Sequence, residues 1–247
     1  MFELLEPDWS VPGVTAFTTT RAGGHSTAPW DSFNLGDHVG DDPAAVAANR
    51  EALASLLPRG SRVQWLRQVH GTRVVKAGVE TGIPDADASW SNQPGAVCSV
   101  MTADCLPVLF ASRDGRVVAA AHAGWRGLLD GVLEATVAAM PVDSVQIIAW
   151  MGPSIGPEAF ELGPEVYRAF IDAGDAPSAF RAAGREGHYL GDMYALARGR
   201  LQRLGVTDIT GGGLCTFNDP ARFYSYRRDG EQSGRMATVI CINPGTE

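Results

Sequence analysis

The sequence lacks closely spaced cysteine pairs and has no excess of positive charge. Its four cysteines, Cys98, Cys105, Cys215 and Cys241, stand singly in apolar stretches. Structural zinc sites usually take cysteines in pairs a few residues apart, so this pattern argues against such a site. Single cysteines in apolar stretches also fit a reducing compartment better than a disulfide framework. The formal net charge is −8, whereas nucleic acids and anionic membranes attract basic faces. We therefore expect neither a nucleic acid nor a membrane among its partners.

Long apolar runs are missing as well. No stretch approaches the roughly 20 apolar residues that a membrane span needs, and Glu3 and Glu6 stand where a secretory signal would be basic. With 247 residues, 45% apolar and 19% charged, the chain can bury a substantial core as one large domain or two small ones. We expect a soluble cytoplasmic protein.

Periodicity and turn residues predict a mixture of helices and strands. Strands are expected over residues 14–20, 97–102, 108–111, 117–121, 144–150 and 238–242, and helices over residues 43–57, 125–140, 164–173 and 192–204. The segments 62–69 and 73–79 are predicted to pair as a hairpin around Gly71. Glycines 211–213 match neither a phosphate-binding loop nor a dinucleotide fingerprint, and we interpret them as a flexible turn.

Three short stretches carry side chains that suit a metal. They are Gln68-Val69-His70-Gly71, Ala103-Asp104-Cys105-Leu106-Pro107 and Ala121-His122-Ala123-Gly124-Trp125-Arg126-Gly127. A single Cys or His is more often part of a core, but His70, Cys105 and His122 all end apolar runs that open into Gly or Pro. Three such ligands are the number that a catalytic zinc takes from protein while keeping one position open. The pattern therefore predicts an enzyme.

A carboxylate and an arginine stand next to these predicted ligands. Asp104 precedes Cys105 and is the candidate general acid or base, although strict strand alternation would turn it to the opposite face. Arg126 follows His122 at the start of a predicted helix, where backbone N–H groups favour anions.

Several motifs in a fixed order carry a resemblance to a known family. They are Phe17-Thr18-Thr19-Thr20-Arg21 with Gly23-Gly24, Ser32-Phe33-Asn34-Leu35-Gly36-Asp37-His38-Val39-Gly40-Asp41-Asp42-Pro43, Asn49-Arg50, the three metal-suited stretches, Gly152-Pro153-Ser154-Ile155-Gly156, and Tyr226-Arg227-Arg228-Asp229-Gly230 with Gly234-Arg235. With them the chain resembles the YfiH-like family, long labelled multicopper polyphenol oxidoreductase or laccase and later associated with purine nucleoside phosphorylase and adenosine deaminase activities.

The resemblance implies a fold, a site and a cofactor. The fold is α+β, with mixed β-sheets flanked by helices, of the YfiH-like cysteine-hydrolase type, and residues 1–247 form a single catalytic domain. His70, Cys105 and His122 are implied as metal and catalytic residues, holding zinc, with copper as the alternative. Two departures, Trp90 after the Asp-Ala motif and Ser154 where some members carry Cys, could change the choice of substrate without touching these ligands.

Physical chemistry separates the activities that the family label covers. A blue-copper and trinuclear laccase needs roughly ten histidines with a cysteine. This chain has five histidines, and His25, His38 and His188 lie in predicted loops, which argues against literal laccase chemistry. A purine nucleoside enzyme suits the residues better, either deaminating adenosine with a metal-activated water or phosphorolysing adenosine, inosine or S-methyl-5′-thioadenosine.

Phosphorolysis requires cationic donors for the phosphate. The candidates are Arg21, Arg50, Arg126 and Arg227, joined by Asn34 as a polar substrate-binding residue from the second motif. A solvated surface cation is the alternative interpretation of each arginine, and the position of Arg126 after a predicted ligand argues against it there.

Two other function classes stay open. Cys105 as nucleophile and His122 as base could form a hydrolase or amidase acting on a small peptide or a peptidoglycan precursor. A non-enzymatic zinc module would need a closed site with a fourth ligand, and the sequence offers no convincing one.

Overall fold

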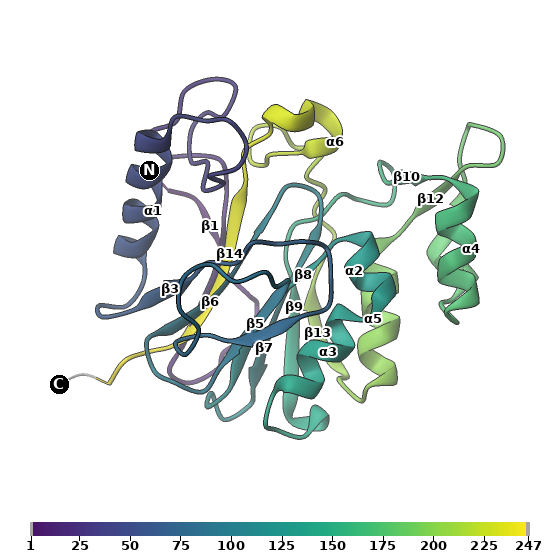
Figure 1. Cartoon of the computed structure of the whole chain (residues 1–247). Coiled ribbons are helices and arrows are strands. Elements are labelled where there is room, and N and C mark those ends of the chain that lie inside the picture. The colour runs from purple at the N-terminus through teal and green to yellow at the C-terminus, as the bar shows by residue number, and fades with distance from the viewer. Residues whose placement is uncertain (1, 246–247) are drawn as a thin grey trace.

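Two β-sheets lie face to face at the centre of the computed structural model, which describes residues 2–245 (Figure 1). The first sheet has the order β1 (Leu4–Leu5), β2 (Val14–Thr19), β14 (Met236–Ile242), β6 (Ala96–Thr102) and β3 (Arg62–Gln64). The second has the order β13 (Asp208–Gly211), β9 (Ile147–Met151), β7 (Leu106–Ser112), β8 (Val118–Ala123), β5 (Ala88–Ser91) and β4 (Val74–Lys76). Both sheets mix parallel and antiparallel pairs.

The central strands are buried on both faces, which explains their near-continuous apolar sequence. Every residue of β6, β7 and β8 is buried. Side chains alternate along a strand, so Leu109 and Val118 join the core between the sheets, whereas Val108 and Phe110 join the core under the helices. His122 falls on the same side of β8 as Val118 and therefore points toward the first sheet.

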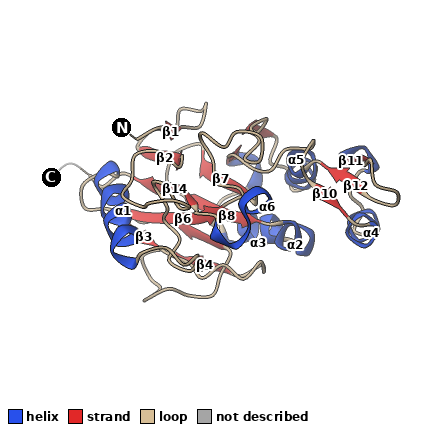
Figure 2. Ribbon diagram, turned by 90° about the horizontal axis from the view of Figure 1, so that it is seen from above, coloured by secondary structure: helices blue, strands red, loops and turns tan. Residues whose placement is uncertain are grey.

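Helices cover the two outer faces (Figure 2). α1 (Pro43–Leu56) packs on the first sheet and begins at Asp42, whose carboxylate accepts a bond from Ala44 N. α2 (Trp125–Asp130), α3 (Val132–Ala139) and α5 (Met193–Arg203) pack on the second sheet. Within residues 2–245, no helix combines the length and apolar character needed to cross a bilayer.

The remaining elements lie at the ends of this layered arrangement. Beyond α5 stand α4 (Pro164–Asp172) and a small sheet of β10 (Glu161–Leu162), β12 (Tyr189–Gly191) and β11 (Phe180–Ala182). α6 (Tyr226–Asp229) is followed by a 3-10 turn at Gly230–Gln232, and further 3-10 turns cover Ser144–Gln146 and Pro177–Ala179.

The expected α+β class with mixed sheets is confirmed, and most expected elements agree with the structure to within a few residues. The helix expected over residues 125–140 is broken at Gly131, whose φ of 98° ends α2 and begins α3. The strand expected over residues 144–150 begins with a 3-10 turn. Of the three glycines expected to form a turn, Gly211 ends β13 and Gly212 N donates to Met151 O at 2.8 Å.

The hairpin predicted around Gly71 is wrong, and the correction explains the position of the site. β3 pairs in parallel with β6 in the first sheet, whereas β4 pairs in parallel with β5 in the second. Residues 65–73 therefore cross from one sheet to the other, as residues 103–105 do between β6 and β7. Because β3 and β6 run parallel, both crossings leave the first sheet at the same edge.

Candidate functional site

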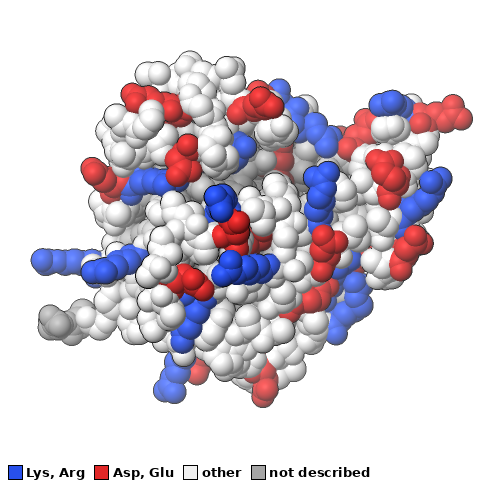
Figure 3. Space-filling model, viewed as in Figure 1, with Lys and Arg blue, Asp and Glu red and all other residues white. Residues whose placement is uncertain are grey.

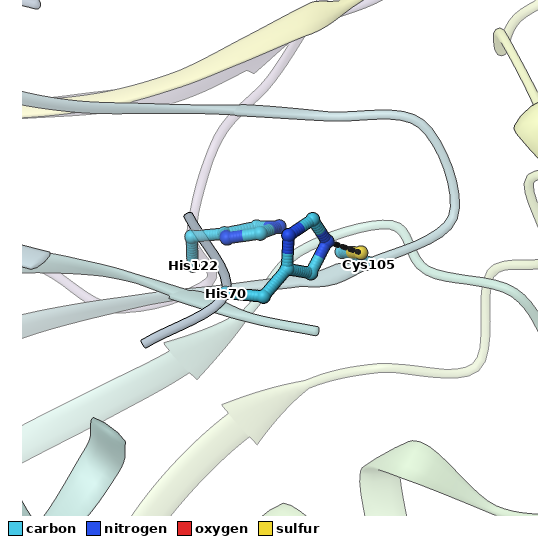
Figure 4. A group of neighbouring side chains, drawn as sticks. All are labelled: His70, Cys105 and His122. Carbon is cyan, nitrogen blue, oxygen red and sulfur yellow. Dashed lines mark hydrogen bonds between the residues drawn. The ribbon is translucent and has the colours of Figure 1, made fainter. Parts of the chain in front are cut away.

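His70, Cys105 and His122 come together at this edge (Figure 4). Their ligand atoms all lie within 4.8 Å of one another, and Cys105 Sγ is 3.9 Å from His70 Nε2. The two imidazole rings meet edge to face, with centroids 4.9 Å apart. His70 is exposed, Cys105 half-buried and His122 buried, so the group is open to solvent on one side. The predicted grouping of these three side chains is confirmed.

The backbone around the cluster is unusual for non-glycine residues. His70 has a φ of 60° and Asp104 a φ of 86°, both in the left-handed region. Gly124, which follows the β8 strand, leaves room for the cluster. A Cβ at that position would lie 2.7 Å from His70 Cδ2 and 3.1 Å from Cys105 Sγ. A side chain at position 124 would therefore displace His70 or Cys105 from its present place.

Asp87, just before β5, orients both histidines and was not assigned a role from the sequence. Its carboxylate accepts bonds from the backbone N–H groups of Val69, His70 and Gly71, at 3.2, 2.9 and 2.7 Å. The same carboxylate lies 2.8 Å from His122 Nδ1, and Asp87 O accepts from His122 N at 2.7 Å. This bond leaves His122 Nε2 facing the cluster. Carboxylates commonly hold metal-binding imidazoles in this way.

The charged groups of the cluster shift one another's pKa values. Burial alone would raise the pKa of the Cys105 thiol, but the charges and hydrogen bonds of His122 and His70 outweigh it and lower the pKa from 9.0 to about 6. Burial works against the charged form of His122, but Cys105 and Asp87 raise its pKa to about 9. Bonds from His122 and the backbone lower the pKa of Asp87 despite burial. The arrangement thus favours a thiolate beside an imidazolium in the metal-free protein.

The cluster lies in the wall of a cavity of about 900 Å³. One part of the wall is apolar, with Trp125, Ile155, Phe160 and Met193. In Figure 3 this face of the molecule is hollowed below the region of α6, and basic side chains lie beside the hollow. A cavity of this size with convergent polar groups is typical of a small-molecule site.

Of the predicted phosphate-binding residues, the structure brings Arg126 and Arg227 to the cavity wall. Arg126 is exposed, and its guanidinium lies 4.4 Å from the ring centre of its neighbour Trp125. Arg227 is exposed as well, and its Nη1 donates to the carbonyls of Ala159 and Glu161 at 3.3 and 3.1 Å.

The other three predicted substrate-binding residues do not line the cavity. Arg21 binds the carbonyls of Asp31 and Pro220, at 2.8 and 3.1 Å. Arg50 binds Leu35 O and the Asp37 carboxylate, at 3.0 and 3.1 Å.

Asn34 is fully buried and holds a loop rather than facing the cavity. Its amide nitrogen donates to Gly36 O and the Asp41 carboxylate, at 3.1 and 2.8 Å. The contacts of Arg21, Asn34 and Arg50 therefore support the surrounding loops. The sequence motifs could not distinguish a loop-holding side chain from one that faces the cavity.

Asp104 lines the cavity, but its carboxylate oxygens are already engaged. Oδ1 accepts from Thr216 Oγ1 and Oδ2 from Arg227 N, both at 2.6 Å. Its carbonyl accepts from Ser154 Oγ at 2.7 Å, so Ser154 supports the turn before Cys105. Asp104 lies in the crossing between β6 and β7 with a positive φ, so the strand alternation expected for it does not apply.

His38, Tyr226 and Arg235 also line the cavity and were not predicted as site residues. His38 and Tyr226 lie within the quoted motifs, and Arg235 follows Gly234 in the last of them. Nothing in the local pattern separates Arg235 from the neighbouring arginines, so only its position in the fold identifies it. Trp90, noted as a departure, lies outside the cavity wall and packs on the core under the helices.

Comparison with known proteins agrees with the family expected from the motifs. Residues 15–243 match the family model described as multi-copper polyphenol oxidoreductase laccase. A purine nucleoside phosphorylase of Pseudomonas aeruginosa is 54% identical over 240 residues, which cover 96% of this chain and 98% of that protein. The purine nucleoside phosphorylase YfiH of Escherichia coli is 51% identical over 249 residues, covering 98% of this chain and 100% of that protein.

Solved structures show the same fold. A protein of Neisseria meningitidis matches with a TM-score of 0.93 and 48% identity, covering 98% of this chain and 99% of that one. The YfiH protein of Bacillus licheniformis matches with a TM-score of 0.86 and 28% identity, covering 93% of both chains.

Alkylation of Cys105 should report its lowered pKa. In chelated, metal-free protein, the rate of modification by iodoacetamide should rise with pH through a midpoint near 6, because the thiolate forms above that pH. Replacing His122 with Asn should move the midpoint upward, because the pKa of Cys105 then loses the lowering effect of His122 while burial still raises it. Cys98, whose pKa burial raises to about 12, is the internal control when peptides are quantified by mass spectrometry. A midpoint at the ordinary thiol value in the unaltered protein would contradict the proposed ion pair.

Removing the Asp87 carboxylate should weaken metal binding. Asp87→Asn should lower zinc affinity roughly 10- to 100-fold, because Asp87 orients His122 and the His70 segment. The measurement is competition with a chromophoric chelator. Asp85→Asn is the matched control, because that exposed carboxylate pairs with Arg67 on the surface. If Asp87→Asn binds zinc as tightly as Asp85→Asn does, Asp87 does not support the metal ligands.

Proposed function

The chain belongs to the multi-copper polyphenol oxidoreductase laccase family, and we propose that it is a zinc-dependent purine nucleoside phosphorylase with a His-Cys-His centre. The curated relatives at about half identity over nearly the whole chain carry the name purine nucleoside phosphorylase. The observation that carries the proposal is the convergence of His70, Cys105 and His122 in the wall of a cavity large enough for a nucleoside. Residues from both sheets line this cavity, which supports the proposal that residues 1–247 are one catalytic domain.

The donor set fits zinc. Two imidazole nitrogens and a low-pKa thiol are the borderline-soft ligands that zinc prefers, and atoms within 4.8 Å of one another need only small side-chain movements to reach one ion. The Asp87 bond to His122 supplies the outer contact usual for such imidazoles. Soft thiolate and imidazole donors also suit copper, which is the alternative ion. When bound, the metal would supply Lewis-acid polarisation of the substrate or of water.

The residues of the cavity suit the parts of a nucleoside and a phosphate. The purine base would lie near the cluster, against the rings of Trp125 and Phe160. The arginines in the wall would hold the phosphate. In phosphorolysis a phosphate oxygen bonds to the ribose C1′ while the C1′–N9 bond breaks and its electron pair leaves with the purine. Inosine, adenosine and S-methyl-5′-thioadenosine are the proposed substrates, and adenosine deamination is a second reaction proposed for the same centre.

One observation favours a second candidate function. Cys105, His122 and Asp87 form a chain of nucleophile, base and orienting carboxylate, and the thiol has a lowered pKa. This is the arrangement of a thiol hydrolase of the cysteine-hydrolase type, which would cleave a small amide such as a peptidoglycan precursor. The two functions respond oppositely to metal, because zinc bound to Cys105 and His122 would occupy the nucleophile and the base.

Removal of metal should distinguish them. Phosphate-dependent release of hypoxanthine from inosine should disappear after chelation and return with added zinc. Cys105→Ser should lower kcat/KM by more than about tenfold, because a metal ligand is lost. Cys241→Ala is the control, since that thiol is buried in the core beside α1. Activity that survives complete removal of metal, together with amide cleavage that requires Cys105, would favour the hydrolase instead.

Asp104→Asn tests the proposed proton-transfer role of the carboxylate next to Cys105. If Asp104 acts as the general acid or base, kcat should fall on the order of 10²-fold while the zinc content stays unchanged. The measurement combines steady-state kinetics, metal analysis and thermal unfolding. Full turnover with zinc still bound would exclude that role. A lower melting temperature with unchanged kcat would instead assign Asp104 to holding Thr216 and Arg227.

A further inference from the structure

The cavity has a polar extension next to its apolar wall. His38, Tyr226 and Arg235 line the main cavity and also an adjoining pocket of about 330 Å³, which Val39 and Glu231 complete. Trp125 and Phe160 of the apolar wall belong to the core under the helices and take no part in this smaller pocket. A ligand with an apolar end and a charged end therefore has a separate place for each.

Arg235 is the cation shared by the two pockets. It is half-buried, and its Nη1 donates to the carbonyls of Ser233 and Gly234 on its own turn, at 2.6 and 3.0 Å. Among residues 2–245, no carboxylate oxygen lies within 4.0 Å of its guanidinium nitrogens. A cation that is partly removed from water is costly unless it meets an anion. Its Nε and Nη2 make no hydrogen bond within the described part of the chain.

A loop from the N-terminal half fixes the position of Arg235. Asn34 Oδ1 accepts from Arg235 N at 2.9 Å, and Leu35 N donates to Arg235 O at 3.1 Å. A Cβ at Gly36 would lie 2.8 Å from Arg235 Cγ, so only glycine lets the arginine stem pass. Arg50 holds Leu35 O in the same loop. Asn34 and Arg50, which were expected to bind substrate, therefore position Arg235, which faces the cavity.

The charges around Arg235 leave it available for an anion. Burial lowers the pKa of Arg235, and Cys105, Asp104 and Tyr226 oppose that shift, which is consistent with a guanidinium close to the cluster. The Asp104 carboxylate is occupied by Thr216 and the Arg227 N–H group.

Two further carboxylates lie near the extension. Asp37 is paired with Arg50 at 3.1 Å, and Glu231 is exposed at the rim of the smaller pocket. Arg67, Arg126 and Arg227 also line the wall, and all three are more exposed than Arg235. Arg67 pairs with the Asp85 carboxylate, and Arg227 already binds two carbonyls. Arg235 is thus the most enclosed of the four arginines in the wall.

We propose that Arg235 binds the phosphate co-substrate, with His38 and Tyr226 forming the polar edges of the subsite. The assignment rests on the proposed phosphorolysis. Phosphate at Arg235 and the purine against Trp125 and Phe160 place the ribose C1′ between them, where the new C1′–O bond forms as the C1′–N9 bond breaks. The guanidinium stabilises the phosphate charge throughout and exchanges no proton.

Kinetics of Arg235→Gln test the subsite. The KM for phosphate should rise roughly 10- to 100-fold, as expected for the loss of a charge-assisted hydrogen bond, while the KM for inosine changes little. Arg235→Lys should recover part of the loss by restoring the charge. Arg116→Gln is the matched control, because Arg116 is a highly exposed arginine outside the cavity wall. An unchanged phosphate KM, or an equal rise in both KM values, would overturn the assignment.

Equilibrium binding separates the subsite from the reaction. Inorganic phosphate alone should broaden its ³¹P resonance in the presence of the unaltered protein and of Arg116→Gln, but not of Arg235→Gln. If the unaltered protein binds phosphate through Arg235 yet releases no purine, the subsite stands and the proposed phosphorolysis fails. If it releases purine but Arg235→Gln and Arg235→Lys bind phosphate as well as the unaltered protein does, the phosphorolysis stands and the subsite fails. Far-ultraviolet circular dichroism checks the fold of each variant. If Arg235→Gln does not fold, the phosphate KM and phosphate binding are measured on Arg235→Lys instead.

Discussion

The buried carboxylate of Asp87 holds the site together. It accepts hydrogen bonds from three successive backbone N–H groups in the segment of His70 and also bonds to Nδ1 of His122. Because a buried carboxylate needs such partners, the bonds that stabilise Asp87 also fix the backbone of His70 relative to the imidazole of His122. The left-handed backbone at His70 is held within this set of bonds, and Cys105 then completes the group from the neighbouring crossing. This carboxylate thereby links the exposed segment of His70 to the buried His122.

The position of the cluster follows from how the chain passes between the sheets. The segments with His70 and Cys105 each leave the first sheet at one edge and enter the second, where His122 lies near the end of β8. Segments that change sheets leave the strand ladders, so their side chains no longer alternate between two sheet faces and can converge at this edge. The polar loops that close this edge, residues 34–38 and the turn of α6, are held by Asn34, Arg50 and Asp104. The same edge thereby acquires an apolar wall from the helix layer and a cationic one from the loops.

Much of the fold was predictable because its core strands are short apolar runs bounded by turns, and its helices have clear starts such as Asp42-Pro43. The pairing of the strands was not predictable in the same way. The segments around Gly71 are adjacent in sequence and suggested a hairpin, but each gains more by joining a buried strand of a different sheet. The break between α2 and α3 at Gly131 was not predicted either, because a helix can continue through a glycine or end at it.

The sequence by itself determined the chemistry available to this protein. Two histidines and a cysteine at the ends of apolar runs, within motifs of a known family, were enough to identify the candidate metal ligands. Only the tertiary structure decided which other residues accompany them. Asp87 and Arg235 carry no local signal, since a carboxylate before a strand or an arginine after a glycine is common, and their roles arise from contacts with segments far away in sequence. Arg21, Asn34 and Arg50 show the converse, because side-chain type suggested phosphate binding, whereas burial and partners assign them to holding loops.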